Sequence, residues 1–121
     1  MNSSNYMVRN GMLCIQEPES QKILWEGSFE GLPVIQILPL VNEDGCLVLL
    51  DGAYAKKPTF ENLLRIGTNG SVVWRAQLPQ PHDSFTEIIA VGDRIEAQTW
   101  KGLRVEIDLA TGRTKNPRFV K

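Results

Sequence analysis

The chain has 121 residues, of which 42% are hydrophobic, and its formal net charge is −1 at pH 7. This length suits one domain spanning residues 1–121, and so apolar a chain is not disordered. The near-zero charge excludes a general attraction to nucleic acid or acidic membranes. Residues 1–6 lack the basic start and apolar stretch of a secretory signal, and no apolar run reaches the roughly 20 residues of a membrane span. We therefore expect a cytoplasmic protein.

Strand signals follow one another along the whole chain, as short runs of aliphatic and β-branched residues separated by turn dipeptides such as Asn69-Gly70. The first unit, residues 6–28, is predicted to hold three strands, at 6–10, 12–16 and 22–28. The second unit, residues 34–78, has four, at 34–41, 46–51, 62–67 and 71–78. The third unit, residues 86–120, also has four, at 86–91, 94–100, 103–109 and 113–120. The pattern predicts an all-β protein of antiparallel sheets.

One sequence pattern recurs in these units: a strand that ends in an aliphatic residue, a turn, and a strand that ends in tryptophan. It reads 13–15 followed by Trp25, then 64–66 followed by Trp74, with Ile15 and Ile66 at matching positions. A third copy at 105–107 has Asn116 where the tryptophan is expected. A period of about 40–50 residues with four strands per unit is typical of propeller blades. We therefore expect about three blade-like units, the first incomplete.

The segment 64–75, with Trp74 four residues after Gly70, resembles the quinoprotein-like (PQQ-like) β-propeller repeat, as do 105–113 and, more weakly, 13–25. The resemblance implies the scaffold repeat alone. The adjacent cysteine pair, the acidic base and the calcium ligands of quinoprotein dehydrogenases have no counterpart in this sequence, so no cofactor is expected. We expect Trp25 and Trp74 to wedge between neighbouring blades.

Closed propellers generally need at least about four blades, and this chain supplies three at most. An open array exposes sheet-bearing ends. A homodimer of two half-propellers would hide both ends in a ring of about six blades, and we expect that arrangement. The alternative is a single β-sandwich or barrel.

Candidate chemistry is sparse. Cys14 and Cys46 lie in apolar runs and are predicted to be buried, reduced thiols. His82 is the sole histidine, so neither a zinc site nor a catalytic triad is expected. We predict a protein that is not an enzyme and holds no metal. A hydrolase or lyase that uses His82 as its base stays the alternative, and it requires a carboxylate within hydrogen-bond reach of the ring.

The segment 52–62 is an insertion where neighbouring units have tight turns, and long loops often carry function. Together with Trp100 at a strand end, it supplies the candidate protein-contact residues, which are Tyr54, Lys56, Lys57, Phe60 and Trp100. The predicted function is a protein-binding or self-assembling β-repeat module that acts without nucleic acid or membrane. A small immunity- or inhibitor-type protein that binds an enzyme or toxin is a further alternative.

Overall fold

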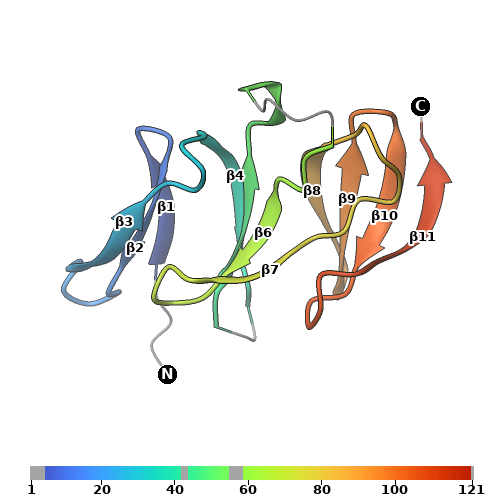
Figure 1. Ribbon diagram of the computed structural model, residues 1–121. Coiled ribbons are helices and arrows are strands. Elements are labelled where there is room, and N and C mark those ends of the chain that lie inside the picture. The colour runs from blue at the N-terminus through green and yellow to red at the C-terminus, as the bar shows by residue number, and fades with distance from the viewer. Residues whose placement is uncertain (1–4, 42–43, 55–58, 121) are drawn as a thin grey trace.

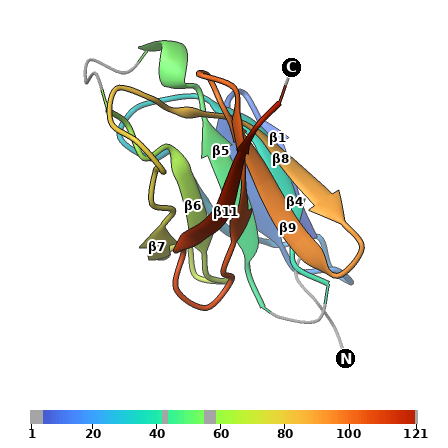
Figure 2. The ribbon, with the colours of Figure 1, turned by 90° about the vertical axis from the view of Figure 1, so that its right-hand side faces the viewer.

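The structure is a computed structural model that describes residues 5–41, 44–54 and 59–120. Eleven strands form three antiparallel sheets that follow one another along the chain and lie side by side (Figure 1). Figure 2 looks along this row from the side of the last sheet. The predicted all-β architecture of blade-like sheets, with an incomplete first unit, is confirmed.

Sheet 1 has three strands in the order β1-β2-β3, namely β1 (Asn5–Arg9), β2 (Met12–Gln16) and β3 (Ile23–Gly27). Sheet 2 consists of β4 (Val34–Pro39), β5 (Cys46–Leu50), β6 (Leu63–Ile66) and β7 (Val72–Arg75), paired in that order. Sheet 3 consists of β8 (Phe85–Val91), β9 (Arg94–Thr99), β10 (Leu103–Ile107) and β11 (Thr114–Phe119), also paired in sequence. A 3₁₀ helix, η1 (Gly52–Tyr54), follows β5 and was not predicted. Among the described residues no helix is long and apolar enough to cross a membrane.

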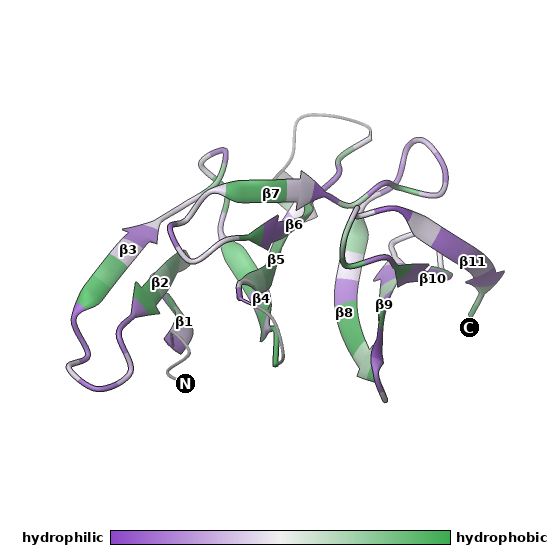
Figure 3. Ribbon diagram, turned by 90° about the horizontal axis from the view of Figure 1, so that it is seen from below, coloured by the Kyte–Doolittle hydropathy of each residue, from purple (hydrophilic) through white to green (hydrophobic). Residues whose placement is uncertain are grey.

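Two apolar layers hold the sheets together. The first lies between sheets 1 and 2 and contains Leu13 and Ile15 against Val48 and Leu64. The second lies between sheets 2 and 3, and β5 contributes to both layers because all five of its residues are buried. Strand β5 therefore reads as a continuous apolar run, as expected for a strand covered on both faces. Figure 3 shows the apolar character of this central strand.

Cys14 and Cys46 are both free thiols and both buried, as predicted. Burial raises the pKa of the Cys46 thiol to about 12. Its Sγ donates to the carbonyl of Leu47 at 3.3 Å. Such a thiol is protonated at neutral pH and acts as a small core residue.

The repeat has a register different from the predicted one. The turns of the three sheets are closed by equivalent main-chain bonds, which run from Glu17 to Lys22, Gly67 to Ser71 and Asp108 to Arg113. These bonds place Gln16, rather than Ile15, in the position of Ile66. Ile15 instead pairs with Trp25 and faces sheet 2. Matching the copies by their aliphatic residues therefore shifted the alignment of sheet 1 by one residue. In a strand, a shift of one residue moves each side chain to the opposite face.

Trp25 and Trp74 lie between neighbouring sheets, as predicted. The Trp74 Nε1 donates a 2.8 Å hydrogen bond to the carbonyl of Leu109 in sheet 3. Trp25 packs against Gly70 of sheet 2 and stacks on Phe29, with the ring centroids 5.5 Å apart. Each tryptophan of an outermost strand therefore contacts the next sheet along the chain.

Candidate functional site

Among the predicted contact residues, the structure describes the side chains of Phe60 and Trp100, and these two differ in exposure. Phe60 is only 5% exposed and packs in the apolar layer between sheets 1 and 2, so its ring is not offered to a partner. The reason is a pair of main-chain contacts that hold the segment against sheet 3: Phe60 bridges Ser84, and its N–H donates to the carbonyl of Asp83 at 3.1 Å. Tyr54 ends the 3₁₀ helix η1. Lys56 and Lys57 lie outside the described residues.

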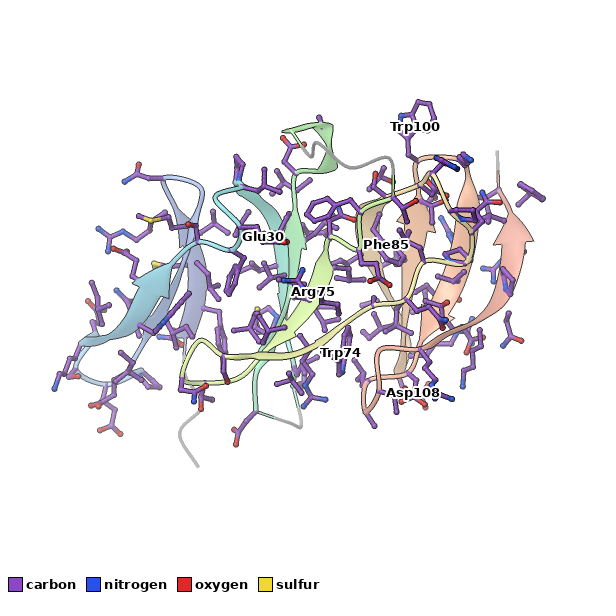
Figure 4. All side chains as sticks on the ribbon, in the orientation of Figure 1. Glu30, Trp74, Arg75, Phe85, Trp100 and Asp108 are labelled. Carbon is purple, nitrogen blue, oxygen red and sulfur yellow. The ribbon has the colours of Figure 1, made fainter. Side chains whose placement is uncertain are left out.

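Trp100 differs from the others because its side chain is 75% exposed. It follows β9 in a turn and projects from one end of the molecule (Figure 4). The main chain beneath it is held firmly: the Trp100 N–H donates to the carbonyl of Ser84 at 2.9 Å, and the Lys101 N–H donates to the Asp83 carboxylate at 3.1 Å. The indole is therefore presented from a fixed base.

A cleft of about 340 Å³ opens beside this indole, and we call it the Trp100 cleft. It lies where the start of β4 and the end of β5 meet the start of β8 and the end of β9. Phe85 is a buried lining residue, while Ile35 is 51% exposed. Its lining residues are Ile35, Asp51, Gly52, Ala53, Ser84, Phe85, Thr86 and Trp100.

Buried polar side chains fix the wall of the cleft. Asn62 is fully buried, and its amide nitrogen donates to the carbonyls of Leu50 and Phe85 at 2.7 and 2.8 Å. Its amide oxygen accepts the N–H of Phe85 at 2.7 Å. The Asp83 carboxylate, 4% exposed, also accepts the N–H of Ser84 at 2.9 Å. These bonds tie the end of sheet 2 to the beginning of sheet 3.

Asp51 is the charged residue among those that line the cleft, and its carboxylate already has a main-chain partner. The Asp51 carboxylate accepts the N–H of Ala53 at 3.0 Å and so caps the start of η1. The remaining lining is apolar or carries hydroxyl groups, from Ser84 and Thr86. The cleft therefore suits an apolar side chain entering between Ile35 and Trp100, with hydroxyl groups at its edge.

His82 is exposed and has a φ of 58°. Its N–H donates to the Thr59 hydroxyl at 2.8 Å. Within the described ranges no hydrogen bond or ion pair joins its ring to a carboxylate, and the neighbouring Asp83 is engaged by main-chain N–H groups. In the part of the chain that the structure describes, the hydrolase or lyase alternative therefore finds no carboxylate bonded to the His82 ring.

A second cleft, of about 180 Å³, lies between the end of sheet 1 and β7. Its charged residues include Glu30 and Arg75, which form an ion pair at 3.0 Å (Figure 4). This pair joins the connection after sheet 1 to the edge of sheet 2. Over the part of the chain that is described, no three histidine, cysteine or acidic side chains gather as metal ligands would.

The outer face of sheet 3 carries a charged cluster that sequence reasoning did not identify. Glu96 is 1% exposed and lies among three arginines, with Arg94 at 3.1 Å, Arg118 at 3.2 Å and Arg104 at 4.0 Å. Burial, the largest single effect, raises the pKa of Glu96, but the hydrogen bonds and charges of Arg94 and Arg118 outweigh it and leave the pKa below its usual value. Alternation along β9 could have shown that Glu96 leaves the apolar layer.

The Ile35, Ser84 and Phe85 contributions to the cleft were also missed by sequence reasoning. Ile35 belongs to β4, whereas Ser84 and Phe85 lie at the start of β8, so only the packing of sheets 2 and 3 brings them together. Trp100 did carry a signal, as a large aromatic residue next to a turn, and Gly52 and Ala53 belong to the predicted insertion 52–62.

Two solved structures resemble this fold. BamB from Moraxella catarrhalis, a PQQ-like β-propeller protein, matches 98% of this chain with a TM-score of 0.64 and 17% sequence identity. The computationally designed protein Ika8 matches 95% of the chain with a TM-score of 0.61 and 11% identity. The chain spans about a third of each structure, 34% and 32% respectively. The TM-scores show a shared fold of propeller-like sheets, and at identities this low the likeness extends to the fold alone.

No curated protein sequence matches the chain. A family described as a domain of unknown function, DUF7957, matches residues 34–119, which comprise all of sheets 2 and 3. This match covers more than half of the sequence and includes every strand that lines the Trp100 cleft. The chain therefore belongs to the DUF7957 family.

Proposed function

We propose that the chain is a non-catalytic protein-binding module and that the Trp100 cleft is its contact surface. The observation that carries the proposal is the 75% exposure of Trp100 on a hydrogen-bonded turn beside an apolar cleft. Tryptophan is enriched among the residues that dominate binding energy at protein interfaces. Because the main chain at Trp100 is already held by hydrogen bonds, little backbone entropy is lost when a partner covers the indole.

The chemistry of the cleft supports a protein partner over a charged small molecule. Ile35 and Trp100 give it an apolar rim, and its carboxylate, from Asp51, already accepts a main-chain N–H. The expected partner inserts an apolar side chain that contacts Ile35 and covers the indole. The propeller-like fold is compatible with such a module, because its blades present loops at fixed positions.

Affinity capture on the immobilised full chain tests the proposal, with Trp100→Ala as the variant and Phe119→Ala as the matched control. Phe119 is an exposed aromatic residue on β11, and its exposure of 78% equals that of Trp100 within a few percent. We expect Trp100→Ala to weaken partner binding at least about tenfold and Phe119→Ala to leave it unchanged.

Equal capture by the wild type and Trp100→Ala would remove the cleft as the contact surface. Equal losses in the two variants would indicate non-specific aromatic adhesion. Circular dichroism of each variant establishes that the fold is intact, which we expect because both side chains extend into solvent.

A further inference from the structure

From residue 5 on, where the structure describes it, sheet 1 has no strand at the innermost position that β4 and β8 take in the other two sheets. The turns closed at Glu17, Gly67 and Asp108 are equivalent, and they make β3, β7 and β11 the matching outermost strands. Counting inward, β1 matches β5 and β9. Sheets 2 and 3 then continue with β4 and β8, whereas among the described strands β1 is bonded only to β2.

The main-chain groups on the open edge of β1 can be assigned from its hairpin. Arg9 and Met12 flank a two-residue turn with positive φ at Asn10 and Gly11, so they form the hydrogen-bonded closing pair. Pairing alternates along an antiparallel ladder. The N–H and C=O groups of Tyr6 and Val8 therefore point away from β2, toward the open edge.

Sheet 2 shows what occupies this edge when the sheet is complete. The residues that match Tyr6 and Val8 are Leu47 and Leu49 of β5. They pair with Leu38 and Gln36 of β4. A strand beside β1 would accordingly place one residue opposite Tyr6 and another, two positions earlier in its own sequence, opposite Val8.

Gln36 adds a second link, to the next sheet. Its amide nitrogen donates to the carbonyl of Ile88 at 2.8 Å, and its amide oxygen accepts the Ile88 N–H at 2.8 Å. In sheet 2 the residue that matches Ile88 is Ile37, since each lies opposite the equivalent position of the second strand. By the same alternation, the main-chain groups of Ile37 point away from β5.

We propose that β1 accepts a fourth strand from a partner protein, antiparallel to β1, by β-strand addition. The partner strand carries an amide side chain opposite Val8 and an apolar residue opposite Tyr6, so that it reads Gln-x-apolar like 36–38 of this chain. The amide bridges to the main chain of Ile37 as Gln36 bridges to Ile88. This surface is separate from the Trp100 cleft, and the inference does not depend on that cleft.

The test uses the full chain and a synthetic peptide that carries residues 34–38 of β4 between terminal lysines. Before addition, the Tyr6 and Val8 amides should exchange with D₂O faster than the Met7 amide, which is bonded to β2. At about 1 mM peptide, a concentration that reveals even weak binding, NMR should show the Tyr6 and Val8 amides protected. Protection of Leu47 and Leu49 should stay unchanged, because β4 keeps its place.

Two matched changes sharpen the test. Val8→Pro removes one outward N–H but none of the β1–β2 bonds, and it should weaken the peptide at least fivefold while the fold persists. In the peptide, Gln→Leu at position 36 should weaken binding about tenfold, because the two bonds to Ile37 are lost. The peptide change probes the same edge if Val8→Pro fails to fold.

Failure to bind at about 1 mM, or binding that protects a different strand edge, overturns the proposal. Slow exchange of the Tyr6 and Val8 amides in the free chain would also overturn the proposal, because the edge of β1 would then already be covered. Trp100→Ala should leave peptide binding unchanged, so failure at this edge and failure of the Trp100 cleft are distinguishable.

Discussion

The indole of Trp74 lies directly on Gly112, the turn glycine of the next sheet. A Cβ atom at Gly112 would lie 2.6 Å from Trp74 Cε3, so the contact requires a residue without a side chain. Trp25 has the same relationship to Gly70, where a Cβ would lie 2.3 Å from Cε2 of the indole. The tryptophan of one sheet and the turn glycine of the next thus form a joint that the chain uses twice.

Neither end of the row can repeat this joint. Gln21 stands at the glycine position of sheet 1, and Asn116 stands at the tryptophan position of sheet 3. A ring of two copies would have to close through contacts of another kind, and the outer face of sheet 3 offers the charged cluster around Glu96. The homodimer stays a prediction.

Gly112→Ala should destabilise the protein by about 2–4 kcal/mol, through the clash with Trp74 and the strain of a side chain at a φ of +77°. Gly92→Ala is the control, because Gly92 also has positive φ, at +60°, but a Cβ there meets nothing within 4 Å. The control should lose only about 1 kcal/mol, the conformational part of the effect. Urea denaturation measures both values, and equal losses would show that the joint contributes nothing.

Gln21→Gly should stabilise the chain by about 0.5–1 kcal/mol, because Gln21 holds a φ of 58° that glycine adopts without strain. The turn bond from the Gln21 N–H to the carbonyl of Glu17 is kept. The reverse change in the next sheet, Gly70→Gln, should be strongly destabilising because Trp25 occupies the space. Thermal unfolding should therefore shift in opposite directions, and shifts of the same sign would contradict the joint.

Glu96→Gln should lower the melting temperature at pH 7, because three arginines would then lack their shared carboxylate. The folded-state pKa of Glu96 lies below its unfolded value, so its charge stabilises the fold above the unfolded pKa, and this stability is lost as pH falls through the folded pKa. The difference between variant and wild type should accordingly narrow as the pH falls below about 4.

Glu106→Gln provides the comparison for this pH series. Glu106 lies on the next strand and accepts a hydrogen bond from the Asn116 side chain at 3.1 Å. Its replacement should change the melting temperature less than Glu96→Gln at pH 7. A pH-independent loss in Glu96→Gln would show that packing, rather than charge, is responsible.

The strands could be predicted from sequence because each sheet is built from neighbours along the chain. Hairpin turns such as Asn10-Gly11 mark where a strand ends, and the apolar runs between turns supply the rest. The resemblance to a propeller repeat and the wedge role of Trp74 followed from the same local pattern. Where each strand pairs with its neighbour along the chain, the sequence pattern of strands and turns is enough to predict the pairing.

The register of sheet 1 depended on the length of one turn, and the candidate site depended on contacts that are distant in sequence. The longer turn that begins at Glu17 shifts the first copy, which aliphatic matching could not detect. Phe60 is buried because Asp83 and Ser84 hold its main chain, more than 20 residues later in the sequence. Whether an aromatic residue beside a turn packs inward, as Phe60 does, or projects, as Trp100 does, is decided by the neighbouring sheet.

Asn62→Ala should destabilise the fold by about 2–4 kcal/mol, since it leaves the buried N–H of Phe85 and the carbonyls of Leu50 and Phe85 without their amide partner. Gln36→Ala is the matched comparison, because Gln36 makes the same two-way bond to Ile88 from a partly buried position. Water can replace that amide, so the loss should be about 1 kcal/mol. Denaturant titration of the two variants should therefore rank Asn62 well above Gln36. Equal losses would mean that water also reaches the Asn62 position, and the wall of the Trp100 cleft would then be less rigid than the bonds at Phe85 indicate.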